Sequence, residues 1–321
     1  MNEMIIKDIE QSMLNTLNNE QMLLLDKVLK KYLDYNINQE NTNNDMIHNF
    51  IKSKRLEGCS ARTIKYYNYN LIKYLEYSNK NFNQIDTNDL RLYLDYYQMN
   101  NNVSRISIDN IRRVLSSFFN WLEEENYIIK NPMKRIHKIK VDKIIKETYS
   151  DEMILALKDN VKSERDLAII ELLSSTGMRV GELVKLNIRN IDFENKECIV
   201  FGKGNKERKV FFDAGTKVHL KEYLNTRCDD NEALFVSLNK PYLRLQISGV
   251  EIMLRKLGKS IGLLKVHPHK FRRTLATKAI DKGMPIEQVQ KLLGHSKIDT
   301  TLEYAMVDIN NVKLSHKRYI S

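Results

Sequence analysis

The spacing of apolar residues across residues 45–127 restricts the fold of this chain more than any other feature. Apolar side chains recur there every three or four residues, which is the period of a helix with one buried face. Ser60, Thr87 and Ser104 each precede one of these apolar stripes and can cap a helix N-terminus. The pattern predicts four helices, with aromatic residues such as Phe118 and Phe119 in a core rather than on a base-stacking surface.

Polar segments separate this helical region from the rest of the chain. Residues 4–35 have the apolar period of one long helix, and the polar run from Asn36 to Asp45 follows it. That helix either binds a partner or packs on the neighbouring helical domain. Asn131 and Pro132 end the helical region, and residues 133–147 are a linker with seven basic residues, His137 included. The predicted division is 1–42, 43–130, 131–147 and 148–321.

The second half of the chain predicts a mixture of helices and strands. Two β-rich runs, 197–202 and 207–212, flank a basic tip and predict a hairpin. Lys203, Lys206 and Arg208 in this hairpin are either functional or simply solvated charges. Helices are expected near residues 151–160, 164–175, 180–187, 214–226, 246–261, 270–282 and 285–293.

Charge and composition limit the class of partner. The chain of 321 residues carries a net charge of +11. Residues 1–44 hold four basic and seven acidic residues, so the remainder carries +14, which favours a polyanion as partner. Three scattered cysteines without a CxxC pair support neither a zinc site nor a disulfide framework. With no apolar run of membrane-spanning length and no signal-peptide pattern, a cytoplasmic DNA-associated protein is expected.

Three stretches carry candidate site residues. Arg179 follows Gly177, a predicted helix C-cap, and precedes a new helical run. His269 and Arg272 are three residues apart and therefore share one helix face. His295 and Tyr304 are nine residues apart, after a glycine that suits a left-handed C-cap. Taken alone, each stretch is also compatible with packing or a surface salt bridge. No GxxxxGK[ST] loop or acid cluster occurs, which argues against an ATPase or a two-metal nuclease.

The ordered set of these residues resembles the tyrosine recombinase (phage integrase) family, and its Xer-like and transposon-integrase branches in particular. The resemblance extends from about residue 45 to the C-terminus and includes the run NVSRISIDNIRRVLSSFFNWLEEENYIIKNP. It implies a mainly α fold with a small β-sheet (α+β). In such a fold a helical SAM-like core-binding domain precedes a mixed α/β catalytic domain. The matching positions are Arg179, Lys203, His269, Arg272, His295 and Tyr304.

The resemblance also implies a chemistry for each position. Tyr304 would attack the phosphodiester and form a 3′-phosphotyrosine, while Arg179 and Arg272 hold the non-bridging oxygens. His269 would take or relay the Tyr proton, His295 would donate to a phosphate oxygen, and Lys203 would protonate the leaving 5′ oxygen. Glu182 would orient Arg179 or His269, or is a surface ion-pair partner. No cofactor, metal or ATP is expected.

Double-stranded DNA is the expected partner, bound by four copies of the chain on two DNA sites, with possible accessory proteins. The apolar residues of segment 308–321 either fold back on their own catalytic domain or, as the resemblance implies, dock on a neighbouring copy. Basic residues on the polar faces of the helical region suit phosphate contact, or are ordinary solvated charges: Arg62, Lys65, Arg105, Arg112 and Arg113. A type IB topoisomerase and a non-catalytic DNA-binding protein are the rival functions. The length, the helical-domain motifs and the tail favour recombination.

Overall fold

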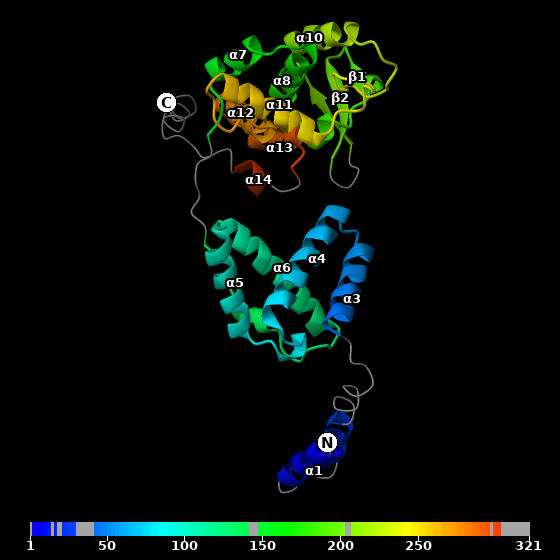
Figure 1. The fold of residues 1–321 in the computed structure, drawn as a ribbon, viewed down its shortest axis with the longest axis vertical. Helices are drawn as coiled ribbons and strands as arrows, with labels where there is room; N and C mark the ends of the chain where they lie inside the picture. Colours follow the sequence, from blue (N-terminus) through cyan, green and yellow to red (C-terminus); the bar gives the residue numbers. More distant parts are fainter. Residues whose placement is uncertain are drawn as a thin grey trace. The chain divides into compact units, whose positions relative to one another are not determined.

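The computed structural model describes residues 2–13, 16–17, 21–29, 42–140, 147–202, 207–295 and 298–302. The chain forms two compact units, Met1–Lys143 and Ile144–Ser321, drawn in Figure 1. Lys203, Tyr304 and the tail 308–321 lie outside the described residues. Each unit is considered by itself below.

The N-terminal unit contains the four expected helices, α3 (Asn43–Leu56), α4 (Ala61–Ser78), α5 (Thr87–Asn101) and α6 (Arg105–Glu124). Ser60 and Ser104 cap α4 and α6 as predicted, since each hydroxyl accepts a bond from the backbone three residues later. The predicted cap at Thr87 is wrong. The carboxylate of Asp86 caps α5 by accepting bonds from two backbone N–H groups, and the Thr87 hydroxyl donates to the carbonyl of Pro132 instead.

Aromatic side chains fill the core of this unit, as the sequence predicts. Phe50, Phe118 and Phe119 are fully buried, and Phe118 meets Phe50 edge-on with ring centroids 5.2 Å apart. None of these rings is therefore available for stacking on a base.

The predicted single helix over residues 4–35 is wrong. Helix α1 (Asn2–Met13) ends where the carbonyl of Met13 accepts bonds from both Thr16 and Leu17, and a separate helix covers residues 21–29. The asparagines around this break favour turns over helix interior, and the apolar period alone did not reveal it.

The first part of the predicted linker packs on the N-terminal unit. Residues Pro132–Arg135 form the short 3-10 helix η2, in which Met133 is buried. Ile136 and Ile139 continue along the same core, and the Ile139 N–H donates to Asp109. Apolar residues spaced by three thus cover the core, while the basic residues between them face outward.

The C-terminal unit combines a small sheet with helices. Strands β1 (Ile191–Asp192), β2 (Glu197–Phe201) and β3 (Glu207–Phe211) are antiparallel in the order β1-β2-β3. The hairpin of β2 and β3 was predicted, whereas β1 was not. Cys198, Val200 and Val210 face the core of this unit. The remaining helices are α7 (Asp151–Asp159), α8 (Glu164–Thr176), α9 (Val180–Leu183), α10 (Ala214–Asn225), α11 (Ile247–Ser260), α12 (Pro268–Asp281), α13 (Ile286–Leu293) and α14 (Asp299–Leu302).

Helix α9 is shorter than the predicted 180–187. The carbonyl of Leu186 accepts bonds from the Leu234 N–H and from the guanidinium of Arg244, and Ile188 donates to Glu232. These bonds to a distant segment replace those of a longer helix. The starts of α12 and α13 also differ from the predicted ranges 270–282 and 285–293. Pro268 is the first residue of α12, and Pro285 precedes α13 as its N-cap.

Candidate active site

Arg179 is the N-cap of helix α9, two residues after the C-terminal cap of α8. Gly177 ends α8 with φ of 59°, and a Cβ there would lie 2.5 Å from Cδ2 of Leu275, so both conformation and space require glycine. The Arg179 side chain is 44% exposed. Its backbone N–H donates to Oε2 of Glu182 at 2.8 Å, and its Nη1 donates to Oε1 at 3.1 Å. The arginine is thus exposed to a ligand but anchored at its base.

Glu182 is almost completely buried, with 4% of its side chain exposed. Burial opposes ionisation, but the guanidinium of Arg208 and the backbone and side chain of Arg179 outweigh it and hold the pKa of Glu182 below its usual range. The carboxylate is therefore ionised, and it anchors Arg179. The alternative of a surface ion pair does not fit its burial.

Arg272 lies in the interior of α12, only 2% exposed. Its Nη1 donates to the carbonyl of Gly177 at 2.7 Å, and its Nη2 donates to the carbonyl of Leu293 at 2.5 Å. The two carbonyls lie at the C-terminal ends of α8 and α13, where the helix dipole favours a cation. One side chain therefore joins the segments that carry Arg179 and His295.

His269 lies in the first turn of α12 and is exposed, on the same face as Arg272. The neighbouring residues His267 and Arg273 have other partners. The His267 N–H donates to the hydroxyl of Tyr149, and Arg273 donates to the carbonyl of Glu147. These contacts distinguish His267 and Arg273 from the predicted pair, His269 and Arg272.

His295 follows Gly294, which ends α13 with φ of 66°. The His295 N–H bonds to the carbonyl of Gln290, a left-handed helix ending that fixes the backbone of the histidine. Its Nδ1 lies 2.9 Å from Oγ1 of Thr301, a fully buried residue of α14. When Thr301 donates this bond, the neutral ring carries its proton on Nε2 and can donate to a ligand.

The groups that shift the pKa of His295 include the other candidate residues, which therefore lie near it. Burial, together with the positive charges of Arg272, Arg179 and Arg208 and the neighbouring His269, lowers the pKa of His295 to about 4. His295 is therefore neutral at pH 7. Of the six predicted catalytic positions, the structure places these four in one electropositive site: Arg179, His269, Arg272 and His295.

This low pKa predicts a pH-dependent stability. A histidine with the ordinary value of 6.5 in the unfolded chain and about 4 in the folded chain binds more protons when unfolded between those two values. The free energy of unfolding then decreases as the pH falls from about 6.5 to 4. We expect the melting temperature of the wild type to fall more steeply across this window than that of His295→Gln, measured by circular dichroism. Parallel slopes would show that the folded chain does not keep His295 neutral.

The sequence assigned no specific role to two residues near the site. Arg208 was expected to be either functional or a solvated charge of the hairpin, and it lies on the inward face of β3 with Val210. The period-two alternation of Glu207–Phe211 contains that signal. Thr301 lies between His295 and Tyr304 in the sequence, and its pairing with His295 has no local signal there.

Two family models match most of the chain. The model of the phage integrase family matches residues 134–311, and that of the phage integrase N-terminal SAM-like domain matches residues 46–129. The chain belongs to the phage integrase family. A curated relative, tyrosine recombinase XerC of Staphylococcus aureus (strain bovine RF122 / ET3-1), is 33% identical over 274 residues, covering 80% of this chain and 90% of that protein.

Solved structures of other phage integrase family members have the same fold. The Tn1549 transposon integrase in complex with a circular intermediate DNA matches with a TM-score of 0.71 and 19% identity, covering 85% of this chain and 98% of that one. The XerH site-specific recombinase bound to a palindromic difH substrate matches with a TM-score of 0.69 and 22% identity, covering 98% of this chain and 95% of that one. The expected fold, mainly helical with a small sheet, is confirmed.

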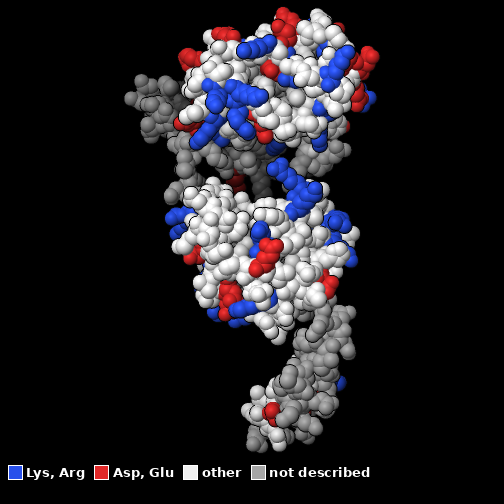
Figure 2. All heavy atoms as spheres, viewed as in Figure 1, with Lys and Arg blue, Asp and Glu red and all other residues white. Residues whose placement is uncertain are grey.

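The predicted DNA-contact residues of the N-terminal unit differ in how accessible their side chains are to a phosphate. Arg62, Lys65 and Arg105 are exposed. Arg112 is 13% exposed and Arg113 60%, and both donate to the buried carboxylate of Asp109. Arg112 is therefore the least available of the five for a phosphate. Figure 2 shows Lys and Arg side chains on the visible face of both units.

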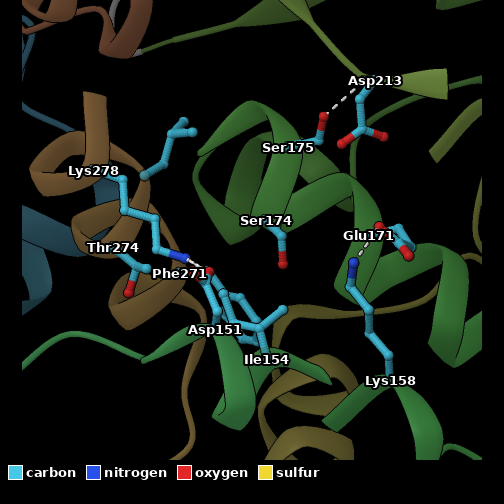
Figure 3. Close-up of a pocket in the computed structure, with 11 residues that line it drawn as sticks. Asp151, Ile154, Lys158, Glu171, Ser174, Ser175, Asp213, Phe271, Thr274 and Lys278 are labelled. Atoms are coloured by element: carbon cyan, nitrogen blue, oxygen red, sulfur yellow. Dashed lines mark hydrogen bonds and ion pairs between the residues drawn. The ribbon is translucent and has the colours of Figure 1, made fainter. Parts of the chain in front are cut away.

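A pocket among the described residues lies elsewhere in the C-terminal unit, between α7, α8 and α12. Figure 3 shows Lys158 directed at Glu171 and Lys278 directed at Asp151 along its wall. Of the predicted catalytic residues that the structure describes, none lines it. The candidate active site is thus separate from this pocket.

Proposed function

We propose that this protein is a site-specific DNA recombinase that cuts and rejoins strands through a 3′-phosphotyrosine intermediate. The observation that carries the proposal is the convergence of Arg179, Arg272 and a neutral His295 at two adjoining helix ends. Two guanidinium groups suit the two non-bridging oxygens of a phosphodiester, whose negative charge grows as a nucleophile attacks. The relatives named as recombinases, and the DNA bound to the solved family members, agree with this substrate.

The remaining roles follow the family pattern. Tyr304 would attack phosphorus, with His269 taking or relaying its proton, and Lys203 would protonate the departing 5′ oxygen. The phosphotyrosine keeps the energy of the broken bond, so a 5′-hydroxyl of another strand can reverse the step without ATP. We propose that four copies act on two DNA sites, with accessory proteins where the site requires them. We also propose that the protein acts in the cytoplasm, because its substrate is DNA. No helix among the described residues has the length and apolarity needed to cross a bilayer.

A nicked duplex tests the function directly. Duplexes that bind the protein are first selected from a randomised pool, and the cleaved strand is then nicked a few bases beyond each candidate position. After attack, the short 5′-hydroxyl fragment diffuses away and the adduct cannot reverse. We expect a covalent complex that survives denaturing electrophoresis. A protein that binds these duplexes and forms no adduct would be a non-catalytic DNA-binding protein.

We expect cleavage to require no divalent metal. Arg179 and Arg272 supply the positive charge that a metal supplies in nucleases. Within the described ranges, no group of three or more His, Cys, Asp or Glu side chains is arranged to hold a metal. Adduct formation should therefore proceed at the same rate in excess EDTA as in magnesium at constant ionic strength. Loss in EDTA, with recovery on adding magnesium alone, contradicts this mechanism.

A further inference from the structure

Arg208 connects three parts of the candidate active site, although it is not among the family positions discussed above. It lies on β3 opposite Val200 of β2, and its side chain is 13% exposed. The side chains of Arg208 and Val210 point to the same face of the strand, toward the interior. An inward-facing arginine on a hairpin needs buried partners.

Glu182 is the first of these partners. Nη1 of Arg208 donates to Oε1 of Glu182 at 2.7 Å, and Nη2 donates to Oε2 at 2.8 Å. This forked pair fixes the plane of the carboxylate. Each of the same two oxygens also accepts one bond from Arg179, from its side chain and its backbone N–H respectively. The position of Arg179 therefore depends on a carboxylate that Arg208 holds in place.

The backbone before His295 is the second partner. A Cβ at Gly294 would lie 2.8 Å from Cδ and 3.0 Å from Nε of Arg208, so the arginine stem packs directly against this glycine. The stem is held in this position, because its guanidinium is bound at the far end by Glu182. Gly294 is thus needed for its left-handed φ and also for the approach of Arg208.

We propose that Arg208 is a positioning residue for strand cleavage, which sets Arg179 through Glu182 and supports the turn that carries His295. Arg208 does not bind the phosphate itself, because the ionised carboxylate of Glu182 takes both of its terminal nitrogens and neutralises its charge, whereas the carbonyls bound by Arg272 are neutral. Because Arg208 belongs to β3, its bonds to Glu182 also connect the hairpin of β2 and β3 to the site. This inference rests on the proposed function.

Substitution of Arg208 distinguishes a role in positioning Arg179 from a role in folding. In Arg208→Met the stem remains but the forked bond is lost, and Glu182 no longer fixes Arg179. We expect single-turnover adduct formation at saturating enzyme to slow on the order of 100-fold, as for a misplaced catalytic group, while DNA affinity stays within about threefold. Lys209→Met is the matched control, because Lys209 on the same strand faces outward and pairs with Glu197 at the surface. It should cleave at the wild-type rate.

A double substitution tests whether Arg208 acts through Arg179. If it does, Arg179→Ala combined with Arg208→Met should be no slower than Arg179→Ala alone, since residues that act as a unit are non-additive. A merely structural role predicts that the two losses multiply, and that result overturns the proposal. So does a folded Arg208→Met that cleaves at the wild-type rate.

A second variant decides the question if Arg208→Met does not fold. Arg208→Lys keeps the charge and most of the stem, but a single ammonium group cannot make the forked bond. We expect cleavage about tenfold below the wild type with an unchanged melting temperature, and wild-type cleavage by this variant overturns the proposal. The wild type forms an adduct in every one of these outcomes. Its failure to do so would instead reject the proposed function.

Discussion

Replacing Tyr304 with phenylalanine is expected to abolish covalent attachment to DNA while leaving DNA binding intact. The substitution removes only the hydroxyl oxygen that attacks phosphorus, and no other side chain replaces it in forming the ester. Loss of a nucleophile predicts a rate at least ~10⁴-fold lower. Adduct formation on the nicked duplex measures the rate, and a gel-shift titration measures the affinity.

Tyr242→Phe is the matched control for this experiment. Tyr242 belongs to the same C-terminal unit, in the segment between α10 and α11, and it loses the same oxygen. It should form the adduct at the wild-type rate. An adduct formed by Tyr304→Phe would show that the nucleophile is another residue, and peptide mapping of the attached DNA would then locate it.

The four helices from α3 to α6 could be predicted because their signals are local. Ser60 and Ser104 each cap a helix whose apolar stripe begins within the next turn, so a short window contains both start and buried face. The end of α9 could not be predicted in this way. The carbonyl of Leu186 bonds to Leu234 and Arg244, residues far along the chain that no local period reveals.

In the candidate site, too, local features could be predicted from the sequence and contacts between distant residues could not. The order and spacing of Arg179, Arg272 and His295 indicated the family and the chemistry before any geometry was known. The structure adds the partners that hold these groups. Glu182 was predicted as an orienting residue, and it does bond Arg179. Arg208 was missed because its partner lies 26 residues away in sequence, even though strand alternation placed it inward.

Arg272 is expected to be essential both for stability and for cleavage, and two substitutions distinguish these roles. Arg272→Ala leaves the carbonyls of Gly177 and Leu293 without their donor in a buried setting. Each unsatisfied buried group costs about 1–3 kcal/mol, so the C-terminal unit should melt at a clearly lower temperature. Circular dichroism of the full chain follows this melting. The single tryptophan, Trp121, lies in the N-terminal unit, and its fluorescence transition should not move.

Arg272→Lys tests the chemistry with the charge retained. One ammonium group cannot bridge both carbonyls and also present a planar fork to a phosphate, so cleavage should fall on the order of 10³-fold even where the variant is folded. Arg273→Ala is the control from the next position on α12, since Arg273 donates to the backbone carbonyl of Glu147 and lies toward the surface. Its stability should stay within about 0.5 kcal/mol of the wild type, with cleavage unchanged. If Arg272→Lys cleaves like the wild type, a point charge suffices at this position, and the forked hold on the phosphate is wrong.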